Sequence, residues 1–138
     1  MKSGLGSPRD VVEQWVAAFN ARDAHAAAAL YHEDATNWQV AAGDPAVGRQ
    51  TILGDLVSFF RAFPDSFTQV ENLFEDGEWA MLEWFGGGTW RGEFAGSSPN
   101  GKSFTLRGCG FFHVVDGKIT FQRGYWDRAT WFGQLGIV

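Results

Sequence analysis

Cysteine, basic residues and long apolar runs are scarce in this sequence. With Cys109 as its one cysteine, the chain forms no internal disulfide, and we expect a buried, unreactive thiol in a reducing, cytoplasmic setting. No apolar run approaches the ~20 residues of a membrane span, and no signal-peptide core opens the chain, so no membrane association is expected. Acidic residues outnumber basic ones 16 to 11, and no basic run occurs. A nucleic-acid partner is therefore not expected.

Aromatic side chains, in contrast, are abundant, with seven Trp, thirteen Phe and two Tyr among 138 residues. This length fits a single domain, which we assign to residues 1–138. The rings have two plausible uses. They fill a core and a subunit interface, or they line a pocket for an apolar small molecule.

The first 64 residues carry helical patterns. Ser7-Pro8-Arg9-Asp10 is typical of a helix start, and the apolar spacing that follows predicts a helix over residues 8–21. Asp23 is suited to cap a short alanine-rich helix that ends near residues 30–32. A third helix is predicted from Gly48 until Pro64 stops it.

The remaining sequence alternates with a period of about two, which predicts strands. The expected strands are residues 67–74, 79–85, 89–94, 104–115 and 119–126, with a sixth short strand over 36–40. Asp116-Gly117 between two apolar runs is a strong hairpin signal. The fold class is therefore α+β, with three N-terminal helices on a strongly curved, mostly antiparallel six-stranded sheet.

A sheet that curves around helices in this way forms a cone. We expect the cone to enclose an apolar cavity that opens at one end. Glycines inside or beside strands favour the bends that this curvature requires. They are Gly86, Gly87, Gly88, Gly92, Gly96, Gly108 and Gly110.

Asp127 is the main candidate for chemistry. On an unbroken strand, Arg123, Tyr125 and Asp127 share one face with Ile119 and Phe121. If that face lines the cavity, desolvation raises the pKa of Asp127 toward a value suited to general acid or base catalysis. The alternative is an exposed Asp127 that caps a terminal helix over residues 128–135, or that pairs with Arg123 or Arg128.

Other polar residues leave alternatives open. Glu83 interrupts an apolar strand, either as a second carboxylate beside Asp127 or, as we favour, in an ion pair with Arg107 or Arg123. Asn37, Trp38 and Gln39 carry donors that are suited to orient a ligand carbonyl, or they are ordinary turn and edge residues. No spacing matches a metal site, a nucleophile elbow or a nucleotide-binding loop, so no metal and no cofactor are expected.

Several segments in this order resemble the SnoaL-like polyketide cyclases of the NTF2-like superfamily, over nearly the whole chain. The segments are Val11-Val12-Glu13-Gln14-Trp15, Asn20-Ala21-Arg22-Asp23, Tyr31-His32-Glu33-Asp34-Ala35, Gly48-Arg49, the run from Gly88 to Gly96, Pro99-Asn100-Gly101-Lys102, Asp116-Gly117-Lys118-Ile119, Tyr125-Trp126-Asp127 and Gln134-Leu135-Gly136. The resemblance implies that Asp127 is the acid/base of an intramolecular aldol closure, with no cofactor.

More distant relatives match less well. In ketosteroid isomerases the functional positions fall on Trp15, Gln39 and the region of Leu106, which carry none of the required groups. Limonene-type epoxide hydrolases keep an Asp at the place of Asp127, but the partner residues of that site are not intact. The cyclase pattern itself departs at Trp90, where a His is common, and at Arg123, where a Trp is common.

The sequence therefore favours a cofactor-independent cyclase or isomerase acting on a hydrophobic carbonyl compound, with Asp127 as the catalytic residue. A noncatalytic binding protein or dimeric scaffold is one alternative, and a limonene-type epoxide hydrolase with an altered site is the other. The expected substrate-binding residues are Trp15, Asn37, Trp38, Gln39, Phe60, Trp84, Phe112, Arg123 and Tyr125. Apolar residues on the outer sheet face predict a homodimer.

Overall fold

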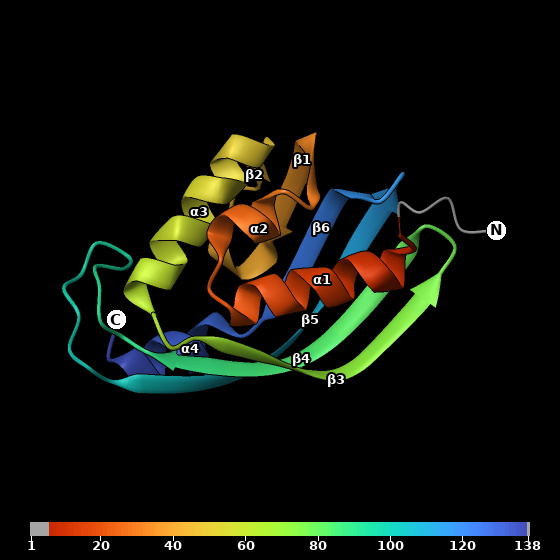
Figure 1. Ribbon diagram of the computed structural model, residues 1–138. Coiled ribbons are helices and arrows are strands. Elements are labelled where there is room, and N and C mark those ends of the chain that lie inside the picture. Colours follow the sequence, from red (N-terminus) through yellow and green to blue (C-terminus); the bar gives the residue numbers. More distant parts are fainter. Residues whose placement is uncertain (1–5, 138) are drawn as a thin grey trace.

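Four helices lie on one face of a curved six-stranded sheet in the computed structural model, which describes residues 6–137 (Figure 1). The helices are α1 (Pro8–Asn20), α2 (Ala24–Ala28), α3 (Arg49–Ala62) and α4 (Arg128–Leu135). The strands are β1 (Tyr31–Gln39), β2 (Ala46–Val47), β3 (Phe67–Asp76), β4 (Trp79–Thr89), β5 (Ser103–Val115) and β6 (Lys118–Trp126), and a 3-10 turn, η1 (Val40–Ala42), follows β1. The α+β prediction is confirmed.

Local chemistry sets the helix ends where the sequence predicts them. The Ser7 hydroxyl accepts from the backbone N–H of Asp10, and Pro8 occupies the first turn of α1. Asp23 caps α2 in the same way. Helix α3 stops just before Pro64. The capping signals therefore predicted the helix boundaries to within a few residues.

The strands run in the order β2-β1-β6-β5-β4-β3, antiparallel throughout except that β1 and β6 are parallel. Two predictions need correction, and one strand was missed. The predicted strand over residues 89–94 is absent because β4 continues through Gly86–Gly88 to Thr89. The strand predicted over 36–40 begins earlier, at Tyr31. The two-residue strand β2 was not predicted.

Two groups of buried side chains fill the space between helices and sheet. The first joins α1 and the N-terminal part of α3 to strands β1 and β3–β6, with Trp15, Tyr31 and Phe112 among its members. The second lies toward α4 and gathers Phe63, Trp90, Phe104 and Trp131. Half-buried Trp84 packs against both groups, so the interior is continuous from α1 to α4.

Candidate functional site

A chain of hydrogen bonds crosses the first buried group. The indole N–H of Trp15 on α1 donates to the Tyr31 hydroxyl over 3.0 Å, and that hydroxyl donates to Oε1 of Gln122 on β6. All three side chains are buried. An indole N–H only donates, so the direction of the chain is fixed, and the NH₂ group of Gln122 is left free. Burial raises the pKa of the Tyr31 phenol, which keeps it protonated as a donor.

A second chain of hydrogen bonds lies beside the first. The indole N–H of Trp126 donates to Oε1 of Gln39 over 2.9 Å, and Nε2 of Gln39 donates to Oδ1 of Asn37 over 2.8 Å. Here too the donor-only indole fixes the direction. The NH₂ group of Asn37 takes no part in this chain of hydrogen bonds.

The two chains end on neighbouring residues. Asn37 and Gln122 are register partners in the parallel β1–β6 pair, so their side chains leave the same face of the sheet about 5 Å apart. Neither NH₂ group has a hydrogen-bond partner within residues 6–137. We call Asn37 and Gln122 the amide pair. Two neighbouring neutral donors on an inner sheet face are suited to receive one oxygen atom of a ligand.

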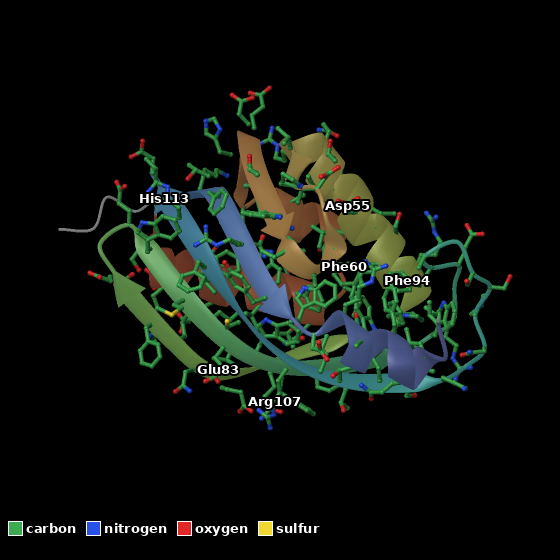
Figure 2. All side chains as sticks on the ribbon, turned by 180° about the vertical axis from the view of Figure 1, so that it is seen from behind. Asp55, Phe60, Glu83, Phe94, Arg107 and His113 are labelled. Carbon is green, nitrogen blue, oxygen red and sulfur yellow. The ribbon has the colours of Figure 1, made fainter. Side chains whose placement is uncertain are left out.

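Aromatic rings fill the interior around the amide pair. Trp15 stacks on Phe19 at 5.3 Å between centroids and contacts Phe112 at 5.5 Å. Phe60 of α3 packs edge-on against Phe19, and Figure 2 places it between α3 and the sheet. Two hollows among the described residues lie at the surface. The larger, of about 450 Å³, is an open depression between residues 21–25 and α3. Neither of these two hollows is an enclosed apolar cavity, so the enclosed cavity stays a prediction.

Trp131 on α4 is the centre of the second buried group. Its ring contacts six others, including those of Phe94 at 4.9 Å and Trp126 at 5.1 Å. Its Nε1 is buried and has no hydrogen-bond partner in the part of the chain that the structure describes. An unsatisfied buried donor costs free energy, so the α4 end of the interior holds a polar group without a partner.

Asp127 differs from the expectation of a desolvated acid. It is exposed and forms the N-cap of α4, where its carboxylate accepts from the backbone N–H of Thr130 over 3.0 Å and from the Thr130 hydroxyl. These hydrogen bonds lower the pKa of Asp127, opposite to the predicted direction. The helix-capping alternative is the one that the structure supports.

Three predicted binding residues lie on the outer face of the sheet, although the prediction placed them on the face toward the helices. They are Trp38, Arg123 and Tyr125. A register shift places one extra residue, Thr120, between the pairs Val114–Ile119 and His113–Phe121. Because of this bulge, Ile119 and Gln122 both face the helices, although an unbroken strand would place them on opposite faces. The alternation of side chains is therefore reversed from Phe121 onward. The outward side chains after the bulge are Phe121, Arg123 and Tyr125, with Trp38 beside Arg123 on β1.

Glu83 is exposed on the outer face, which Figure 2 shows as the side away from the helices. Its carboxylate accepts from Nδ2 of Asn72 over 2.6 Å, and the predicted ion pair is wrong, because Arg107 pairs with Glu71 instead. The bulge between Val70 and Asn72 inserts Glu71 on β3 and supplies that partner.

Of the predicted binding residues, six face the interior and three do not. Those that face it are Trp15, Asn37, Gln39, Phe60, Trp84 and Phe112. Sequence reasoning missed Tyr31, Gln122 and Trp126. Tyr31 was placed at a helix end and Gln122 on the outward phase of its strand. Both residues belong to patterns that the bulges on β1 and β6 interrupt, and no sequence signal marks those bulges.

One further carboxyl stands out. Asp55 lies on α3, one turn from both Ile52 and Phe59, and partial burial raises its pKa although much of the side chain reaches solvent. Residues 6–137 contain no group of three or more His, Cys, Asp or Glu side chains placed to hold a metal ion. No helix among them is long and apolar enough to cross a membrane.

Comparisons with known proteins agree with this architecture. The family model for SnoaL-like polyketide cyclases matches residues 9–135. IdmH from Streptomyces antibioticus, a candidate polyketide cyclase, is 27% identical with a TM-score of 0.79, over 96% of this chain and 100% of that one. A candidate polyketide cyclase from Pseudomonas putida is 24% identical with a TM-score of 0.80, over 94% and 98%.

A third structure bears on the fold alone. A protein from Catenulispora acidiphila with a ketosteroid isomerase-like fold, in complex with trimethylamine, is 20% identical with a TM-score of 0.80, over 96% of both chains. No curated protein matches this sequence.

Proposed function

Because the chain belongs to the SnoaL-like polyketide cyclase family, we propose that it binds a hydrophobic carbonyl compound between α3 and the β1–β6 pair. The carbonyl oxygen accepts hydrogen bonds from the NH₂ groups of Asn37 and Gln122. The observation that carries this proposal is the amide pair, two unspent donors held in place by separate hydrogen-bond chains.

The chemistry of the amide pair fits an enolisable substrate. When solvent water takes a proton from the carbon beside a carbonyl, negative charge moves to the oxygen. Donors already aimed at that oxygen stabilise the developing enolate more than the neutral ketone. An enolate of this kind is the nucleophile of an aldol ring closure. Since amides do not titrate, Asn37 and Gln122 keep the same hydrogen-bonding capacity at every pH at which the protein is folded.

The apolar part of the ligand belongs among the rings. Leu53, Leu56 and Phe59 on α3 are half-buried, and we propose that they form the cover over the amide pair. The ligand enters by displacing part of this cover, so the apolar surface it buries replaces ring contacts that already exist. Binding therefore favours a flat, conjugated compound over a flexible aliphatic one.

A noncatalytic binding protein is the second candidate function, and the position of Asp127 favours it. The carboxylate is exposed and engaged by Thr130. Glu75, an acidic residue on the helix side of β3, is exposed and accepts a hydrogen bond from the backbone N–H of Arg9 on α1. Under this alternative the amide pair holds a carbonyl oxygen without any proton transfer.

Binding is tested with 1-phenylbutane-1,3-dione, an aromatic diketone, titrated against the wild type and two variants that keep side-chain size but remove the donor. These are Asn37→Leu and Gln122→Met, and Gln50→Met on the exposed start of α3 is the matched control. We expect affinity to fall about tenfold in each donor variant and not in the control. Equal affinity in all four proteins would remove the basis of the proposal.

Turnover is tested separately by NMR of the same diketone in heavy water. Faster deuterium exchange at the carbon between the carbonyls, reduced in Asn37→Leu and unchanged in Asp127→Asn, supports the cyclase-type chemistry. Binding without faster exchange supports the noncatalytic function. Loss of exchange in Asp127→Asn would return Asp127 to the mechanism.

We also propose a homodimer that forms through the outer sheet face, and a cytoplasmic location consistent with the single free cysteine. The dimer is supported by large side chains left in solvent on that face. Phe74 is 59% exposed, and Trp79, Met81 and Tyr125 are each about 40% exposed. A face of this kind favours burial against another surface.

A further inference from the structure

A buried hydrogen-bond donor lies at the α4 end of the interior. The side chain of Trp131 is 8% exposed, and its Nε1–H has no hydrogen-bond partner within residues 6–137. An indole N–H only donates, and the six Phe and Trp rings that contact it carry no oxygen or other acceptor atom. A buried donor in this state costs free energy, which an oxygen atom of a ligand recovers by accepting from it.

Trp126 lies between this donor and the amide pair. Its indole N–H donates to Gln39, which in turn holds Asn37, and its ring meets that of Trp131 edge-on at 5.1 Å between centroids. One indole therefore separates the amide pair from Trp131. A ligand that reaches both sets of donors needs a flat body of about that length, which two fused aromatic rings supply.

Phe94 covers Trp131 more closely than any other ring. Their centroids are 4.9 Å apart, and the other five rings are farther from Trp131. Those five lie on a helix or strand or directly beside one, whereas Phe94 belongs to the loop over residues 90–102 that joins β4 to β5. Figure 2 shows Phe94 beside the end of α3.

The tip of this loop has little else to hold it. Phe94 and Ser97 hydrogen-bond to each other across a tight turn, in which Ala95 and Gly96 have positive φ angles of 53° and 74°. Among the described residues, the hydrogen bonds of residues 93–99 stay within this turn, whereas the base of the loop bonds to the end of α3 and to α4. Phe94 can therefore leave Trp131 without breaking a hydrogen bond to the rest of the protein.

We propose that the indole N–H of Trp131 is a second binding donor, which holds an oxygen atom at the far end of the ligand whose carbonyl lies on the amide pair. This end of the ligand takes the place of the Phe94 ring, so that Trp131 keeps an aromatic neighbour and gains an acceptor. The ligand is then a fused aromatic compound with an oxygen acceptor at each end. This inference rests on the proposed function and adds the second contact to it.

The test compares two naphthalenes of the same shape. One is 1-(6-acetylnaphthalen-2-yl)butane-1,3-dione, and in its 6-isopropenyl analogue a CH₂ group replaces the far carbonyl oxygen. We expect the wild type to bind the acetyl compound at least about fivefold more tightly. Trp131→Phe keeps an aromatic ring but has no donor, so it binds the two compounds equally. Trp79→Phe, on the outer face, is the matched control and retains the preference.

A second readout needs no substitution of Trp131. The indole N–H proton of Trp131, assigned by NMR from its through-space contacts to the neighbouring rings, moves downfield with the acetyl compound and not with the isopropenyl analogue. Displacement of the loop is tested with Phe94→Ala, which removes the ring that the ligand has to replace and is expected to bind the acetyl compound more tightly. Ser98→Ala, exposed on the same loop, is the control and leaves affinity unchanged.

The other outcomes separate this inference from the proposed function. Equal affinity of the two compounds for the wild type, with both weakened by Asn37→Leu, would leave the proposed function and overturn the Trp131 contact. A preference that survives in folded Trp131→Phe would also overturn that contact. Weaker binding in Phe94→Ala would show that the ligand packs on the Phe94 ring and does not replace it. Binding of neither compound to the wild type would overturn the proposed function and this inference together.

Discussion

The side chain of Gln39 lies directly over Gly124, in the space that a β-carbon at position 124 would occupy. The two residues are register partners on β1 and β6. A side chain at position 124 would overlap the amide that links Trp126 to Asn37, so the Gln39 amide has to move when one is added. The lack of a side chain at position 124 leaves the space that Gln39 needs in the second hydrogen-bond chain.

We predict that Gly124→Ala weakens binding of the diketone about as much as Asn37→Leu does. The new methyl group displaces Gln39, so Asn37 loses the hydrogen bond that orients its NH₂ group. The measurement is the same titration as for the amide variants. Gly133→Ala is the control, because nothing lies within 4 Å of a β-carbon there. Unchanged affinity in Gly124→Ala would mean that Gln39 does not position Asn37.

Tyr31→Phe is predicted to lower the free energy of unfolding by about 2–4 kcal/mol. The change removes one hydroxyl from a fully packed site and leaves two buried groups without partners, the Trp15 indole N–H and Oε1 of Gln122. Urea unfolding checks the value. A loss below about 0.5 kcal/mol would show that the two groups find other partners.

The sequence predicts those features of the fold that depend on residues close together in the chain. The caps at Ser7, Asp23 and Pro64 act within one turn of helix, so the helix limits were predictable. The same holds for the Asp116-Gly117 hairpin between β5 and β6. Glycine was the misleading local signal, because Gly86–Gly88 continue β4 where a break was expected.

The site was harder to predict because two strand bulges decide which side chains face inward. Alternation correctly places Arg123 with Tyr125, but the extra residue Thr120 on β6 moves both to the outer face and Gln122 to the inner one. Bulges depend on pairing with a neighbouring strand, which sequence spacing does not record. For Asp127 the local N-cap signal was present in the sequence and proved the better guide.

Asp127→Ala is predicted to lower Tm at neutral pH, while Asp127→Asn retains most of the stability because Asn also caps helices well. The lowered pKa of Asp127 means that the carboxylate stabilises the folded state above the ordinary Asp pKa, near 4. That contribution is lost as the pH falls through the still lower folded pKa. Thermal unfolding of the wild type and Asp127→Asn from pH 7 to pH 2.5 measures it, and a gap that widens in acid would contradict the assignment.

Asp55 should show the opposite pH dependence. Burial raises the pKa of its carboxyl, so the charged form is less stable in the folded than in the unfolded protein, and the ionised group destabilises the fold above the ordinary Asp pKa. Asp55→Asn is therefore predicted to raise Tm at pH 7, by an amount that shrinks toward zero below about pH 4, where both states hold the proton. Asp34→Asn, on an exposed residue of β1, is the control for removing one negative charge from a chain of net charge −5. If both variants gain equally at pH 7, general charge repulsion explains the effect and the burial of Asp55 does not.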